Sequence, residues 1–174
     1  MKTDWDIFEK IMSIIQLIFG IAIIWIVIKT VKYYLVEIFG SADLNWESLL
    51  QINILEKTYF SFIHGLIGVL GGTLWFKNKK SGWMLSLSFW IITCCTVTLT
   101  TAKSMYRDSF SNIIKSNEEY WIYSIVIFIS LLLIFVLSSK YFREKYKPDL
   151  KTLTIYGSIL ALLLITRFIL FLST

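Results

Sequence analysis

Residues 120–139, YWIYSIVIFISLLLIFVLSS, are 20 consecutive positions without a charged side chain, and they decide the class of this protein. At about 1.5 Å per residue, a helix of this length spans about 30 Å, which is the hydrocarbon thickness of a bilayer. Solid apolar runs predict membrane helices, whereas the strands of outer-membrane barrels alternate apolar and polar residues. The sequence therefore predicts an all-α membrane protein.

Four more apolar runs complete the predicted bundle. Three of them are free of charge over 18, 19 and 22 residues: 11–28, 58–76 and 81–102. The last, 152–166, is cut short by Arg167, yet 13 Leu, Ile and Phe residues lie between Leu153 and Leu172. They favour insertion by about 4 to 8 kcal/mol, against about 3 kcal/mol for a central Arg. A single transmembrane domain with five spans follows: approximately 8–28, 58–76, 81–102, 120–140 and 152–172.

The composition agrees with this class and bears on partners. Hydrophobic residues make up 56% and charged residues 17%, with a mean hydropathy of +0.69. Soluble domains carry about 25% charged residues, so membrane lipids are the expected surroundings. We expect no nucleic-acid partner, because no soluble part is present to offer a groove. The abundance of Ile, Lys and Phe, with one Pro, is typical of AT-rich bacterial genomes and suggests a bacterial cytoplasmic (inner) membrane.

Basic residues set the expected orientation, since cytoplasmic loops are enriched in Lys and Arg. One side of the predicted bundle carries ten: Lys2, Lys10, Lys77, Lys79, Lys80, Lys140, Arg143, Lys145, Lys147 and Lys151. The other carries six: Lys29, Lys32, Lys57, Lys103, Arg107 and Lys115. We therefore expect a cytoplasmic N-terminus and an extracytoplasmic C-terminus.

The expected layout is one helix followed by two hairpins. Each hairpin is preceded by an extracytoplasmic connector that mixes apolar and polar residues. Such mixing favours short amphipathic helices in the membrane interface. They are predicted within Leu44–Glu56 and Met105–Lys115.

No sequence motif carries recognisable chemistry. The chain has one His, no H-E-x-x-H and no G-x-S-x-G, so we expect no enzyme, cofactor or metal site. Cys94 and Cys95 are adjacent, and neighbours on a helix do not face each other. They are interpreted as packing residues.

A polar vestibule open to the outer side is one hypothesis for function, since ionisable groups within membrane spans are costly to keep. His64 and Arg167 are predicted at similar depth below the outer face. Four further residues are predicted on the same side: Thr96, Thr100, Glu118 and Glu119. In the competing interpretation Arg167 snorkels to the headgroups, His64 makes one interhelical hydrogen bond, and the threonines bond their own backbone.

A glycine-rich face is predicted on the second span. Its members, at spacings that place them close together on the helix, are Gly65, Gly68, Gly71 and Gly72. Without side chains there, another helix can approach closely. The partner predicted for this face is the third span or a second copy of the protein.

Two functions of different classes are compatible with these features. The first is a small non-enzymatic membrane protein that acts as a complex subunit or as an oligomerising protomer, including one that forms a channel. Its partners would be a second copy or other membrane subunits. The alternative is a compact transporter or binding protein for an anionic small molecule or lipid headgroup, using the outer vestibule.

Overall fold

The computed structural model describes residues 2–33, 52–111 and 117–173. It is all-α, as predicted, and no strand occurs among these residues. The helices are α1 (Lys2–Tyr33), α3 (Ile52–Phe76), α4 (Lys80–Ser111), α5 (Asn117–Leu137), α6 (Lys140–Tyr146) and α7 (Leu150–Ser173).

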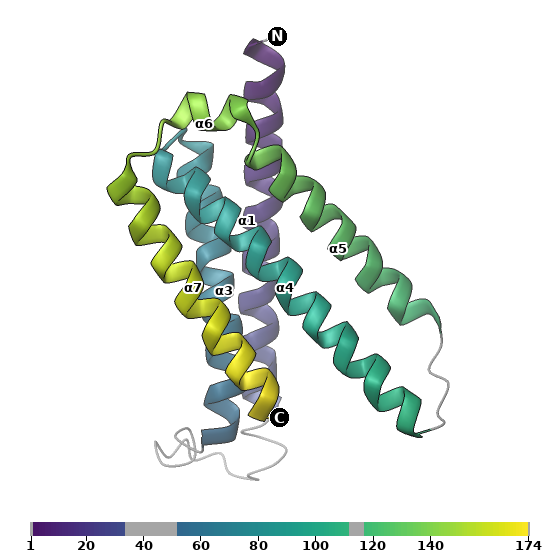
Figure 1. The fold of residues 1–174 in the computed structure, drawn as a ribbon. Helices are drawn as coiled ribbons and strands as arrows, with labels where there is room; N and C mark the ends of the chain where they lie inside the picture. Colours follow the sequence, from purple (N-terminus) through teal and green to yellow (C-terminus); the bar gives the residue numbers. More distant parts are fainter. Residues whose placement is uncertain (1, 34–51, 112–116, 174) are drawn as a thin grey trace. The chain divides into compact units, whose positions relative to one another are not determined.

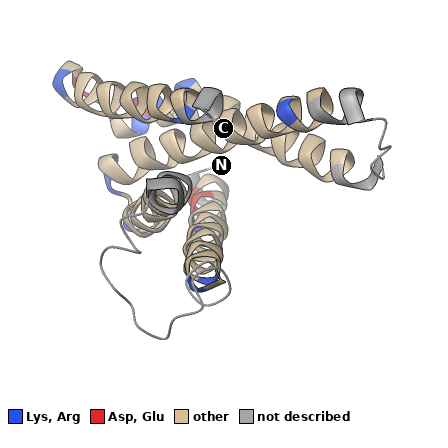
Figure 2. Ribbon diagram, turned by 90° about the horizontal axis from the view of Figure 1, so that it is seen from below, with Lys and Arg blue, Asp and Glu red and all other residues tan. Residues whose placement is uncertain are grey.

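Five of these helices are long and apolar enough to cross a membrane. Their candidate spans are Trp5–Tyr33, Thr58–Phe76, Lys80–Tyr106, Tyr120–Leu137 and Leu150–Ile169. These ranges match the five predicted spans, including the fifth, whose Arg167 does not interrupt the helix. Figure 2 shows the long helices almost wholly without charged residues. The chain is therefore a polytopic integral membrane protein.

The contacts divide the chain into two compact units, Met1–Ser86 and Leu87–Thr174. The first unit contains α1, α3 and the start of α4, and the second contains the rest of α4 with α5, α6 and α7. The boundary thus falls within one continuous helix. That the chain forms a single transmembrane domain stays a prediction.

In the first unit, α1 and α3 lie side by side (Figure 1). A Cβ atom placed on Gly20 of α1 would lie 2.9 Å from the carbonyl oxygen of Gly65 of α3. A Cβ atom on Gly65 would lie 3.1 Å from the carbonyl oxygen of Gly20. The two backbones are therefore in direct contact at these glycines. Close approach of this kind maximises dispersion contacts, which drive helix association in lipid.

A tight turn joins α3 to α4. Asn78 adopts the left-handed conformation, with φ of 53°. Its amide donates to the carbonyl of Trp75 at 2.7 Å, and the amide of Lys79 donates to that of Leu74 at 2.9 Å. These two bonds form a Schellman motif, which satisfies the last carbonyls of α3. Gly82 then lies against the backbone of Trp75, where any Cβ atom would collide.

The second unit contains the connection from α5 through α6 to α7. The short helix α6 is amphipathic, with Phe142 and Tyr146 buried and Arg143 and Lys145 exposed. Asp149 begins α7, because its carboxylate accepts hydrogen bonds from the backbone amide and the hydroxyl of Thr152. This is the N-cap role of an aspartate.

The predicted amphipathic helices differ from what the structure contains. Residues 105–111 of the second connector continue α4 without a break, and residues 112–115 lie outside the described part. Of the first connector, residues 44–51 lie outside the described part and 52–56 are the first turns of α3. The short amphipathic helix that does form is α6, between the fourth and fifth spans. The end of a long helix and a short interfacial helix can have the same mixture of apolar and polar residues. Composition alone therefore does not distinguish an extension of α4 from a separate amphipathic helix.

Candidate functional site

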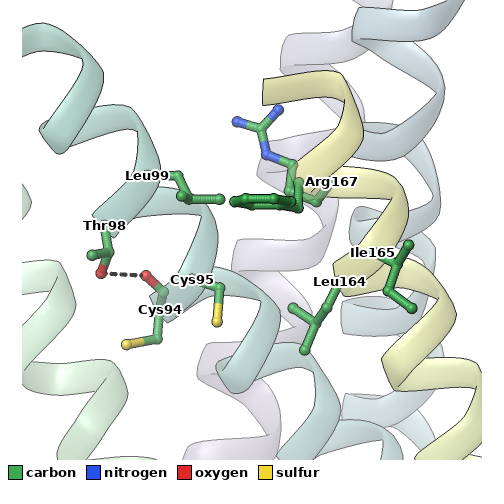
Figure 3. Close-up of a pocket in the computed structure, with 8 residues that line it drawn as sticks. Cys94, Cys95, Thr98, Leu99, Leu164, Ile165 and Arg167 are labelled. Carbon is green, nitrogen blue, oxygen red and sulfur yellow. Dashed lines mark hydrogen bonds between the residues drawn. The ribbon is translucent and has the colours of Figure 1, made fainter. Parts of the chain in front are cut away.

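A groove between α4 and α7 is the candidate site of the second unit (Figure 3). Its volume is about 510 Å³. Helix α4 contributes Cys94, Cys95, Thr98 and Leu99, and helix α7 contributes Leu164, Ile165, Arg167 and Phe168. The walls are therefore almost wholly apolar, and the polar groups that their residues carry are the guanidinium of Arg167 and the hydroxyl of Thr98.

The polar groups of the groove differ in what they offer a ligand. The Thr98 hydroxyl donates to the carbonyl oxygen of Cys94 at 2.8 Å, so its proton is used in a hydrogen bond within α4. Arg167 is partly buried, and its guanidinium points away from both cysteines toward the C-terminal end of α7 (Figure 3). Both cysteines are free thiols. The groove thus has an apolar floor and a cation at one end.

The threonines predicted for the vestibule lie on α4 but do not line this groove. Thr100 donates to the carbonyl of Thr96, four residues earlier, at 2.9 Å. Thr93 and Thr101 bond the carbonyls of Phe89 and Val97 in the same way. Thr96 differs, since its buried hydroxyl has no hydrogen-bond partner among the described residues. Most of these hydroxyls therefore satisfy their own backbone, as in the competing interpretation.

The remaining vestibule residues belong to different units or have side chains outside the described part. His64 is buried on α3 in the first unit, with its ring centroid 6.4 Å from that of Phe60. Arg167 belongs to the second unit. Glu118 and Glu119 fall in the first turn of α5, and their side chains lie outside the described part. A vestibule shared by these residues stays a prediction.

The glycine face of α3 packs mainly on α1, a partner that the sequence analysis did not name. A Cβ atom on Gly72 would lie 2.8 Å from the carbonyl oxygen of Ser13 in α1. Gly71 borders both α1 and α4, because its Cβ atom would lie 2.6 Å from Nε2 of Gln16 and 3.1 Å from Cβ of Leu85. Sequence spacing identifies a face that packs tightly, but it carries no information on which helix fills it.

Two sets of residues escaped the sequence analysis. The first is a set of buried residues on α1 that share one stripe with Gln16, at intervals of three and four: Glu9, Ser13 and Gly20. The second is an exposed stripe on α7 with i, i+4 pairs of small residues: Thr154, Gly157, Ser158 and Ala161. The spacing of each was the signal that could have found it.

No known protein guides the interpretation. Searches against family models, curated proteins and solved structures find no match to this chain. In the part of the chain that the structure describes, no three His, Cys, Asp or Glu side chains gather where they could hold a metal ion. The geometry of the described helices must therefore carry the functional argument.

Proposed function

We propose that this protein is a non-enzymatic membrane component that works by associating with another membrane helix through α7. The observation that carries the proposal is the small-residue stripe defined above, Thr154, Gly157, Ser158 and Ala161. All four positions are exposed. Within the described part of the second unit, a Cβ atom on Gly157 would meet nothing within 4 Å.

The contrast with the first unit supports this proposal. There, the space beside the glycines of α1 and α3 is occupied by the backbone of the facing helix. On α7 the same kind of surface has no neighbour at Gly157 among the described residues of the second unit, and none of the most apolar 18-residue window of this helix is buried. In lipid, helices associate by close van der Waals packing at small residues. A second copy of α7, or a helix of another subunit, fits this surface.

The location proposed for this assembly is the bacterial cytoplasmic membrane, with the N-terminus in the cytoplasm. The excess of basic residues on one side of the bundle supports that orientation. Under the proposal the exposed small stripe runs through the half of α7 nearer the cytoplasm. An assembly of several copies around a pore is one form that this association could take.

Cysteine crosslinking in native membranes tests the association. The background replaces Cys94 and Cys95 with alanine, and one new cysteine replaces Ala161 on the stripe. Disulfides need Cα atoms about 4.4–6.8 Å apart, so they report close approach. We expect a crosslinked product with Ala161→Cys and none with Ile159→Cys, an exposed position about 160° away around the helix.

The mass of the product identifies the partner. A product of twice the monomer mass indicates a second copy, and a product of another mass indicates a different subunit. A disulfide needs a cysteine on both helices, so a photo-crosslinker attached to the thiol at position 161 detects a partner that has none. The proposal is contradicted if positions 159 and 161 crosslink alike, or if neither crosslinks with either chemistry.

A further inference from the structure

The geometry of the groove between α4 and α7 points to a binding site for one anionic phospholipid. We infer that an acyl chain lies between the two helices, on Cys95, Leu164 and Phe168. The lipid phosphate is then held by the guanidinium of Arg167. This site goes beyond the association proposed above and belongs to a different half of α7.

The shape and the walls fit an acyl chain. A volume of about 510 Å³ lies within the range of about 300 to 1,000 Å³ that ligand pockets span. The thiols and the side chains of Leu99, Leu164 and Ile165 offer apolar contact along the groove. Because the Thr98 hydroxyl donates to its own helix, the floor presents no free donor that a hydrocarbon chain would leave unsatisfied.

The position of Arg167 fits a lipid phosphate. Helix α7 runs on to Ser173, so Arg167 lies six residues, or about 9 Å along the helix axis, from the end of the helix. The long side chain of an Arg can extend from such a depth toward the membrane interface. Its guanidinium points toward that end (Figure 3). Leu164 lies about one turn deeper. Charge near the interface and apolar surface below it match the order of groups in a phospholipid.

The charge of the lining selects an anion. Arg167 is the one cation among the lining residues, and no carboxylate is among them. A guanidinium presents five N–H donors in a planar fork that suits phosphate oxygens. A free phosphate would have to leave water to enter an apolar groove, whereas a phospholipid already holds its phosphate at the membrane interface, toward the end of α7 to which the Arg167 side chain points. A lipid is therefore the occupant that the groove favours.

The lipid site and the proposed helix contact can be separated. Leu164 and Phe168 lie on the same stripe of α7 as Gly157 and Ala161, at intervals of three and four. Leu164 follows Gly157 by seven residues, or about 10 Å along the helix. A change in one half therefore need not disturb the other.

Native mass spectrometry of the full-length protein tests the site, because it counts lipids and protein copies in the same spectrum. The purified protein is titrated with phosphatidylglycerol, and separately with phosphatidylcholine. The variants are Arg167→Leu, Arg167→Lys and, as a matched control, Arg143→Leu, which removes an exposed Arg of α6 outside the groove. Leu164→Trp fills the groove while keeping Arg167.

We expect wild type to retain one phosphatidylglycerol in preference to phosphatidylcholine. Arg167→Leu should weaken this binding at least tenfold, which corresponds to about 1.4 kcal/mol. Leu164→Trp should abolish it, whereas Arg143→Leu and Arg167→Lys should retain it. Should Arg167→Leu not accumulate in the membrane, Leu164→Trp and Arg167→Lys carry the same test.

Three results would overturn the lipid site. One is equal retention of the two lipids by wild type, and another is unchanged binding in Arg167→Leu or Leu164→Trp. The third is a change in the number of protein copies on Arg167→Leu, which would make the groove a protein contact. If a substitution at Gly157 lowers the number of protein copies but leaves phosphatidylglycerol bound, the helix association is affected and the lipid site is not.

Discussion

The side-chain amide of Gln16 donates a hydrogen bond to the main-chain carbonyl of Gly68, 3.2 Å away, and so ties α1 to α3. Gly71 makes room for this bond, because a Cβ atom there would lie 2.6 Å from the same amide nitrogen. Gln16 and the glycines around it thus form one packed interface inside the first unit. The stripe on α7 is the corresponding surface of the second unit, where the described residues provide no partner at Gly157.

Adding a methyl group at Gly72 should destabilise the first unit. The Cβ atom of Gly72→Ala would lie 2.8 Å from the carbonyl oxygen of Ser13 and 3.1 Å from the amide of Leu17, and backbone atoms cannot move aside cheaply. We expect a loss of about 1 to 3 kcal/mol, as for other overpacked sites. Gly157→Ala, whose Cβ atom meets nothing, is the control and should not lose stability. Thermal unfolding in detergent, followed by helix content, compares the two, and equal midpoints would contradict the close packing of α1 on α3.

Removing the Gln16 amide should cost less than adding the Gly72 methyl. Gln16→Met keeps an unbranched side chain and removes one hydrogen bond, which in membrane proteins contributes about 0.6 kcal/mol on average. The other polar atom of the side chain, Oε1, is buried without a hydrogen-bond partner among the described residues. Removing it therefore also removes the free-energy cost of burying an unsatisfied acceptor. We therefore expect a loss below about 1 kcal/mol in the same unfolding measurement. A loss above about 2 kcal/mol would mean that the Gln16 amide makes stabilising interactions besides its hydrogen bond to the carbonyl of Gly68.

The orientation can be measured at the turn between α3 and α4. Lys79 is exposed there, next to Lys77 and Lys80. In a background without Cys94 and Cys95, Lys79→Cys should react with a membrane-impermeant maleimide only after the cytoplasmic face is opened. If Lys79→Cys is labelled in cells whose cytoplasmic membrane is intact but whose outer envelope has been removed, this turn lies outside the cytoplasm. The orientation is then opposite to the proposed one.

Much of the fold could be predicted from single stretches of sequence. Charge-free runs give the spans because the bilayer demands them locally, and the Lys77–Lys80 turn is marked by its charge. Arg167 did not mislead the prediction of the fifth span, since the apolar residues around it outweigh one off-centre cation.

The contacts between helices could not be predicted in the same way. Gly20 and Gly65 meet although 45 residues separate them, and nothing in either local pattern names the other. The groove likewise depends on the approach of Cys95 and Leu164, which belong to helices far apart along the chain. Glu9, within the predicted first span, is 1% exposed, and nothing in the local sequence pattern indicated that this charged residue would be buried.

The most direct test of the central claim is the number of copies that native mass spectrometry finds for wild type and for Gly157→Leu. A leucine at 157 starts in open space among the described residues of the second unit, so it should leave that unit folded while blocking close helix approach. The account predicts that wild type leaves its membrane as an oligomer or a complex with another subunit, and that Gly157→Leu leaves as a folded monomer. A monomeric wild type, or an assembly unchanged by Gly157→Leu, would contradict it.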